Sequence, residues 1–140
     1  MKKKKKPKGC SKATAWGWFS KYRRLLFADM NGMVKCVTCG KVEHFKEIHA
    51  GHFVASRNNT VLLMDELVFP QCSTCNKWLS GNRNKYFKFM LDQGYTAEEL
   101  DEFDNLRFKT KKMTPQDWKE QSDKYRKLAK AEAGKRGIFI

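Results

Sequence analysis

Two pairs of cysteines and one histidine are the residues of this chain best suited to chemistry. The pairs are Cys36-Val-Thr-Cys39 and Cys72-Ser-Thr-Cys75, and His52 lies between them in a run Ala-Gly-His-Phe. A Cys-x-x-Cys pair supplies half of a tetrahedral zinc site, and two pairs complete it with four thiolates. Because four protein ligands leave no open position on the metal, we expect a structural Zn²⁺ rather than a catalytic one.

Two other interpretations of the cysteines remain open. The thiols could be buried and paired by coincidence, or they could form a redox pair, although no βαβ pattern surrounds them. The fifth cysteine, Cys10, is left over, and an odd number without a signal peptide does not indicate a disulfide framework. A zinc site would fix both ends of the 32 residues that separate Cys39 from Cys72.

Zinc binding would also bring His52 close to Asn76, which directly follows the last cysteine. Residues 42–55 are predicted to form a strand, a turn near Ala50-Gly51 and a return strand through Phe53-Val54, and a helix is expected to begin at the second cysteine pair. A strand pair followed by a helix, with histidine on the strand and Asn on the helix, is the ββα-metal arrangement. There a neutral imidazole can take a proton from water, and a divalent cation can stabilise a leaving oxygen.

The elements that would position these residues are mostly helical. Apolar residues recur at helical spacing over residues 14–28, so the aromatic side chains, including Trp16, are expected in the core and Arg23 on a basic face. Capping signals start two later helices, at Thr96 and at Thr114-Pro115. The other expected elements are an extended piece at 67–69, a break at 80–82, a helix over 84–93 before Gly94, and an end of the last helix at Gly134.

The composition indicates one basic domain preceded by a basic arm. The chain has 140 residues and a net charge of +14, with six lysines among its first eight residues. We divide it into an arm, residues 1–12, and a zinc-containing domain with C-terminal helices, residues 13–140. The surplus charge favours nucleic acid as partner, bound through its phosphates. With no secretory signal and no stretch able to span a membrane, we expect a cytoplasmic protein, in the host cytoplasm if it is viral.

Three short runs resemble the NinG (Rap) recombination proteins of lambdoid phages. They are Ala50-Gly51-His52-Phe53, Gln71-Cys-x-x-Cys-Asn76, and Ser80-Gly81-Asn82 followed by Tyr86. The resemblance covers about residues 18–103. These proteins are described as structure-specific nucleases for branched recombination intermediates, within the HNH or His-Me finger nucleases. The resemblance implies an α+β fold with a zinc-stabilised ββα-metal core and flanking helices, and a DNA endonuclease.

The resemblance also assigns the candidate catalytic residues. It implies that His52 is the general base and that Asn76 holds a catalytic Mg²⁺ or Mn²⁺, with His49 as a further candidate metal ligand. Two positions depart from the family pattern. Leu67 replaces a middle Asn that braces the loop, and Gly51 stands where many HNH enzymes carry a metal ligand.

The remaining charged and polar residues receive provisional roles. Candidate nucleic-acid contacts are Arg57, Asn82, Lys77 and Arg83; Arg57 could instead be a solvated loop charge and Asn82 a turn residue. His44 is interpreted as a surface residue of the hairpin. Asp65 and Glu66 are interpreted as residues of an exposed loop, although they could instead be metal ligands. Asp101, Glu102 and Asp104 are interpreted as a solvated helix face.

Two rival functions fit the same sequence. One is a non-catalytic zinc module that binds nucleic acid or recruits a partner, and Leu67 and Gly51 are its best support. The other is a zinc-ribbon transcription or packaging factor, which predicts binding without a second metal site. A homodimer would suit symmetric cutting of a branched DNA junction, but no sequence feature indicates one.

Overall fold

A computed structural model describes residues 11–140 of the chain. Cys10 and the predicted lysine arm up to residue 10 lie outside the described residues. In chain order the elements, with η marking short 3-10 or π turns, are α1 (Lys12–Leu26), β1 (Met33–Lys35), β2 (Val42–His44), β3 (His49–His52), η1 (Asp65–Leu67), β4 (Val68–Gln71), η2 (Thr74–Trp78), α2 (Arg83–Asp92), α3 (Ala97–Asn105), η3 (Leu106–Phe108) and α4 (Pro115–Lys135). The fold is therefore mixed α+β with two small sheets, each of two strands.

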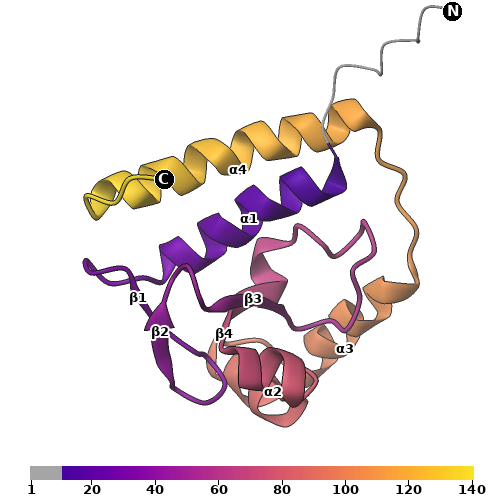
Figure 1. Cartoon of the computed structure of the whole chain (residues 1–140). Helices are drawn as coiled ribbons and strands as arrows, with labels where there is room; N and C mark the ends of the chain where they lie inside the picture. The colour runs from indigo at the N-terminus through magenta and orange to yellow at the C-terminus, as the bar shows by residue number, and fades with distance from the viewer. Residues whose placement is uncertain (1–10) are drawn as a thin grey trace, which may run out of the picture.

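The first and last helices form one layer, in which α1 and α4 lie side by side and run in the same direction (Figure 1). Ser11 caps α1 by accepting a hydrogen bond from Thr14 N, so this helix begins earlier than the apolar spacing alone indicated. Thr114 and Asp117 form a capping box at the start of α4, as predicted, and that helix continues one residue beyond Gly134. At the other end Arg136 donates to Ala28 O, which ties the two helices together.

The predicted hairpin over residues 42–55 is wrong. The chain turns directly after β2, at residues 45–47, and β2 pairs with β1 instead. Ala50 and Gly51 lie in the middle of β3, which is antiparallel to β4 and pairs His52 with Val68. Glycine is needed at position 51 because a Cβ there would lie 2.0 Å from Gln71 Oε1. The residue that suggested a turn instead allows a neighbouring side chain to cross the strand.

Arg23 is buried, although its spacing placed it on the basic face of α1. Its Nε donates to Val68 O, and its guanidinium lies over the rings of Phe27 and Phe69. A planar guanidinium can stack on aromatic rings while it satisfies a strand carbonyl, so it is accommodated where α1 crosses β4. This contact holds the helix against the strand that pairs with β3.

A second core below the strands holds α2 and α3, whose predicted bounds are closely matched. Tyr86 of α2 is fully buried, donates to Gly51 O at 2.7 Å and accepts from Phe69 N at 3.0 Å. One hydroxyl group therefore joins β3 to β4 beside His52. Among residues 11–140, no helix is both long enough and apolar enough to cross a membrane.

Candidate functional site

The four paired cysteines converge on one point. Their sulfur atoms all lie within 4.8 Å of one another, and Cys39 Sγ and Cys72 Sγ are 3.6 Å apart. Tetrahedral Zn–S bonds of about 2.3 Å would separate the sulfurs by about 3.8 Å, so the donor set fits a zinc ion. This cysteine cluster can thus hold a structural metal such as zinc, as the spacing predicted.

Two local turns build the cysteine cluster. The first follows β1, where Gly40 adopts a φ of +83° and its N–H bonds Cys36 O. The second joins the end of β4 to η2. Burial raises the pKa of Cys36, but the nearby Thr38 hydroxyl and backbone amides outweigh this effect and lower the pKa to about 6. That pKa favours the thiolate at Cys36, whereas the pKa values of Cys39 and Cys72 are raised, at Cys72 chiefly by burial. Because the thiolate is the form that binds metal, metal binding would release protons from these thiols.

His52 ends β3 in an enclosed setting. Its Nε2 donates to Leu62 O at 3.1 Å, and its ring stacks on Trp16 with the centroids 4.9 Å apart. Burial lowers the pKa of His52 to about 4; the bond to Leu62 O opposes this shift and the charge of Arg57 reinforces it. The ring is therefore neutral at pH 7, with its lone pair on Nδ1. Within residues 11–140 the structure records no hydrogen bond at that Nδ1 atom.

His49 and Asn76, the other predicted pair, are in direct contact. Asn76 Nδ2 donates to His49 Nδ1 over 3.1 Å. Because side chains alternate along a strand, His49 and His52 point to opposite faces of β3. Asn76 of η2 contacts His49 directly, and it also lines the hollow that is bordered by His52.

Two hollows meet at this point of the molecule. One, of about 240 Å³, is lined by His52, and another, of about 370 Å³, is lined by His49. Ala50, Arg57 and Asn76 line both hollows. We call the first hollow the His52 cavity and the second the His49 hollow. Together they form a polar depression on either side of β3.

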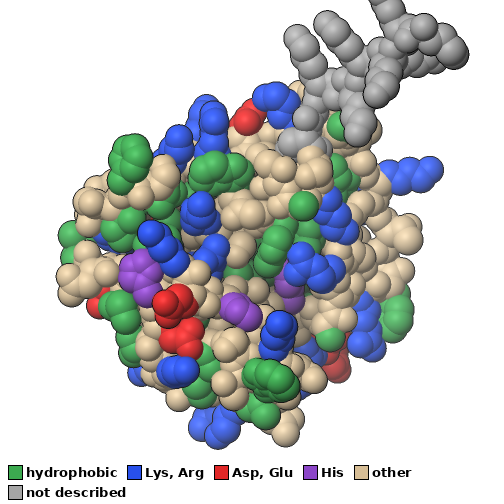
Figure 2. All heavy atoms as spheres, in the orientation of Figure 1, with side chains coloured by type: hydrophobic (Ala, Val, Ile, Leu, Met, Phe, Trp, Pro, Cys, Tyr) green, Lys and Arg blue, Asp and Glu red, His purple; other side chains and the backbone are tan. Residues whose placement is uncertain are grey.

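Positive charge surrounds the depression. The Arg57 guanidinium lies 4.7 Å from the centre of the Trp16 ring, which also stacks on His52. Arg24 and Lys46 line the His49 hollow together with one carboxylate, Glu47, and Arg83 lines the His52 cavity, so basic residues outnumber acidic ones. Figure 2 shows histidine side chains on one face of the molecule among Lys and Arg side chains. The arrangement suits a phosphate group next to a neutral histidine.

Residues 1–135 match the family described as the bacteriophage lambda NinG protein. The chain belongs to the NinG family. The same comparisons find no matching curated protein and no matching solved structure. The family match agrees with the resemblance carried by the runs around His52, Asn76 and Tyr86.

Other predicted contact residues of this NinG protein have partners within the chain. Asn82 has a φ of +46° and its side-chain amide lies 3.5 Å from Cys75 Sγ, so it is a turn residue directed at the cysteine cluster. Arg83 donates to Phe53 O and forms an ion pair with Asp104. Lys77 is exposed. The roles of these residues in nucleic-acid binding stay predictions.

Two predictions about acidic residues of the NinG chain are wrong. Asp104 is not on a freely solvated face: it is only partly exposed and pairs with Arg83 of the neighbouring helix. Asp65 is not on an exposed loop: it begins η1, is partly buried and accepts a hydrogen bond from Tyr125 of α4. Both carboxylates connect elements rather than facing water.

Trp16 is the site residue that the sequence did not reveal. Its helical spacing assigned it to the core, but it is only partly buried and contacts both His52 and Arg57. A core aromatic and an aromatic that lines a cavity have the same spacing along a helix. No signal in the sequence separates these two cases.

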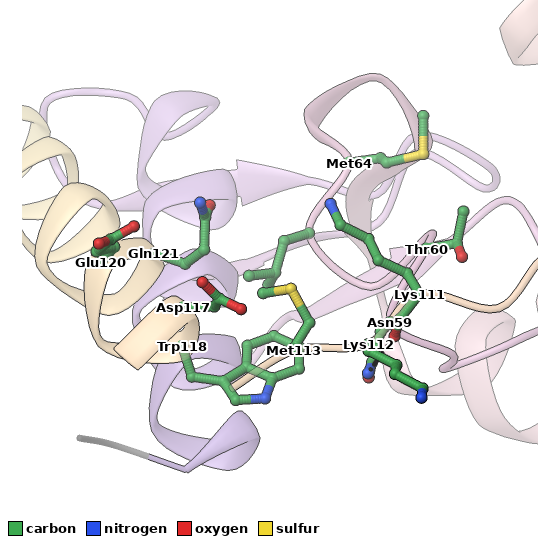
Figure 3. A pocket seen from close by; sticks show the side chains of 11 residues that line it. Asn59, Thr60, Met64, Lys111, Lys112, Met113, Asp117, Trp118, Glu120 and Gln121 are labelled. Atoms are coloured by element: carbon green, nitrogen blue, oxygen red, sulfur yellow. Dashed lines mark hydrogen bonds between the residues drawn. The ribbon is translucent and has the colours of Figure 1, made fainter. Parts of the chain in front are cut away.

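A further hollow of about 310 Å³ lies elsewhere in the NinG fold, at the start of α4 (Figure 3). Trp118 and Met113 supply apolar surface there, and the lining also holds two lysines, Lys111 and Lys112, and two carboxylates, Asp117 and Glu120. It shares no lining residue with the His52 cavity or the His49 hollow. The mixed charges of its rim do not select an anionic ligand.

Proposed function

We propose that this protein is a metal-dependent DNA endonuclease whose reactive centre is the His52 cavity. The observation that carries the proposal is a partly buried, neutral imidazole that opens into a cavity shared with Asn76 and Arg57. The substrate we propose is branched or partly single-stranded DNA, because the family resemblance implies it and the chain is strongly basic.

His52 is the proposed general base. The bond from Nε2 to Leu62 O selects the tautomer and fixes the ring orientation, and the stack on Trp16 restricts it further. Nδ1 then keeps its lone pair and can accept a proton from an attacking water molecule. The low pKa keeps this base unprotonated over the whole neutral range.

The two polar side chains beside β3 fit a divalent cation. Cis ligands of an octahedral Mg²⁺ or Mn²⁺ ion lie about 3.0 Å apart, and His49 Nδ1 is 3.1 Å from the Asn76 amide. Rotation of this amide would present its oxygen next to the imidazole nitrogen, so both residues would hold the ion. When bound, the ion would stabilise negative charge on the leaving oxygen.

An HNH or His-Me finger core is the proposed architecture of this site. Strands β3 and β4 followed by η2 place a histidine on a strand and Asn76 on the helical segment. Leu67 does not leave the loop unbraced, because its carbonyl accepts a hydrogen bond from Phe53 N at 2.8 Å. Arg57, which borders both hollows, is placed to hold a phosphate without selecting a base sequence.

A cleavage assay tests the proposal. Labelled four-way junctions are incubated with protein and Mg²⁺ or Mn²⁺. His52→Gln keeps an N–H that can bond Leu62 O but removes the base, so cleavage should fall by roughly 10²- to 10⁴-fold. The matched control is His44→Gln, on β2 and outside both hollows, which should cut like the wild type. If His52→Gln cuts at the wild-type rate, His52 is not the base.

A non-catalytic zinc module that binds nucleic acid is the second candidate function. It is favoured by the contact between Gly51 and Gln71, because the Gln71 side chain occupies the space of any ligand side chain at position 51. The cation site would then have only His49 and Asn76. Wild-type protein that binds junctions tightly but never cuts them with any divalent metal would support this candidate.

A further inference from the structure

Trp78 is a large apolar side chain that the fold leaves uncovered. It is 80% exposed, and the adjacent Leu79 is 53% exposed. Within residues 11–140 no aromatic or cationic side chain is recorded against the Trp78 ring. Because exposing an indole ring to water is unfavourable, an exposed tryptophan of this kind indicates a surface that a binding partner covers.

The segment that carries Trp78 is held in place. Gly81 N bonds Cys75 O at 2.8 Å, and Gln71 Nε2 donates to Gly81 O at 2.9 Å. Ser80 and Asn82 have φ angles of +49° and +46°, which residues other than glycine adopt only when their surroundings enforce them. The cysteine cluster and Gln71 therefore hold Trp78 at a defined point on the surface.

That point borders the proposed reactive centre. Asn76 and Ser80, each two residues from Trp78, both line the His52 cavity. The exposed pair Trp78 and Leu79 thus lies on the stretch between two residues of the cavity wall. Exposed Lys77 precedes it and adds a charge that attracts phosphate.

We propose that Trp78, supported by Leu79, stacks on an unpaired base of the DNA strand that enters the His52 cavity. An indole ring is a platform for any base, and base–aromatic stacking does not depend on sequence. A stable protein dimer buries about 800 Å² per partner, whereas a tryptophan side chain buries at most about 250 Å². The area therefore matches one base better than a second protein copy.

This inference takes its DNA partner from the proposed function, but it concerns binding rather than cleavage. In a paired duplex the faces of the bases are stacked on one another and are inaccessible to Trp78. Only unpaired bases at a branch, gap or single strand can reach the ring. Trp78 would then be the residue that favours such structures over plain duplex.

The test compares binding of oligonucleotides without added divalent metal, so that cleavage does not interfere. Trp78→Ala should bind single-stranded and branched DNA roughly 5- to 100-fold more weakly, with less than about a twofold change for duplex. The fluorescence of a 2-aminopurine placed at the branch should be quenched by the wild-type protein, through stacking on Trp78, and should not be quenched by the variant. Phe139→Ala, which removes a 99% exposed aromatic from the C-terminus, is the matched control and should change neither value.

Several outcomes would overturn the inference. Equal weakening for duplex and single strand would indicate a general loss of binding, and unchanged affinities would indicate that the ring contacts no base. A dimer of wild-type protein in sedimentation that dissociates in Trp78→Ala would identify a second protein copy as the partner. A different outcome would separate the two proposals. If the protein never cuts DNA but binds unpaired DNA in a way that depends on Trp78, the proposed nuclease is refuted and the stacking site is supported.

Discussion

Cys75 and Asn76 are neighbours in η2, yet they belong to two regions of opposite character. The cysteine cluster has four like donors from two turns, and three of them are buried. The His52 cavity has unlike donors, lies open to solvent and is bordered by Ala50 and Gly81, which offer no functional side chain. The donors of the first region suit one metal ion and leave no open position on it, whereas the second region has room for a ligand.

The comparison teaches that the cysteine cluster and the proposed reactive centre are separated by a single peptide bond. Successive residues of a helical segment point about 100° apart, so one can face the cysteine cluster while the next faces the cavity. Gln71 connects the regions, since its Nε2 donates to Thr38 beside the cluster and to Gly81 at the cavity wall. The cluster thus holds Asn76 at the wall of the cavity, where the proposed chemistry would take place.

The largest expected effect comes from breaking the closed region. Cys72→Ser should remove one zinc ligand and, with it, most of the stabilisation that a structural zinc supplies, which is about 10–16 kcal/mol in small zinc domains. We expect an unfolded protein by circular dichroism and a loss of the single zinc per chain in metal analysis. Cys10→Ser, at the cysteine that belongs to neither Cys-x-x-Cys pair, is the control. A folded, metal-free Cys72→Ser protein would contradict the zinc assignment.

A smaller effect is expected where the two regions meet. Gly51→Ala places a Cβ 2.0 Å from Gln71 Oε1 and 2.8 Å from its Cδ. Gln71 is fully buried, so the clash should lower the free energy of unfolding by about 1–3 kcal/mol in chemical denaturation. Gly17→Ala on α1 meets no atom within 4 Å and should be neutral or slightly stabilising. Equal stability of Gly51→Ala and wild type would mean that Gln71 moves aside freely.

The last effect concerns pH and is specific to the open region. The pKa of His52 is about 4 in the folded protein and 6.5 in the unfolded chain. Between these values the unfolded chain binds more protons, so the contribution of His52 is present above pH 6.5 and is lost as pH falls toward 4. The stability difference between wild type and His52→Gln should shrink over this window, with zinc content checked at each pH. A difference independent of pH would mean that His52 titrates normally.

Local signals in the sequence predicted their own elements well. The capping boxes at Thr96 and Thr114 and the turn at Gly94 are all present. These features depend on hydrogen bonds and backbone angles within a few residues, which neighbouring residue types determine. The convergence of four cysteines was also predictable, because paired thiols at this spacing have few other uses.

Long-range partners were not predictable in the same way. Strand β3 pairs with β4 rather than with the adjacent residues, and Gly51 serves a side chain that comes from residue 71. Arg23 and Asp104 were assigned to water because their spacing was that of exposed residues, yet each has a buried or cross-helix partner. The spacing of residues in the sequence describes a single helix or strand, whereas the burial of a side chain depends on the other elements that pack against it.

The sequence by itself determined which atoms can react: four thiolates for a metal, a histidine, an asparagine and a surplus of positive charge. Only the tertiary structure decided how they are placed. It stacked Trp16 on His52, directed Asn82 to Cys75 and left Trp78 exposed. The physical reason is that residue type sets the chemistry of a side chain, while its pKa, partners and exposure come from segments distant in the chain.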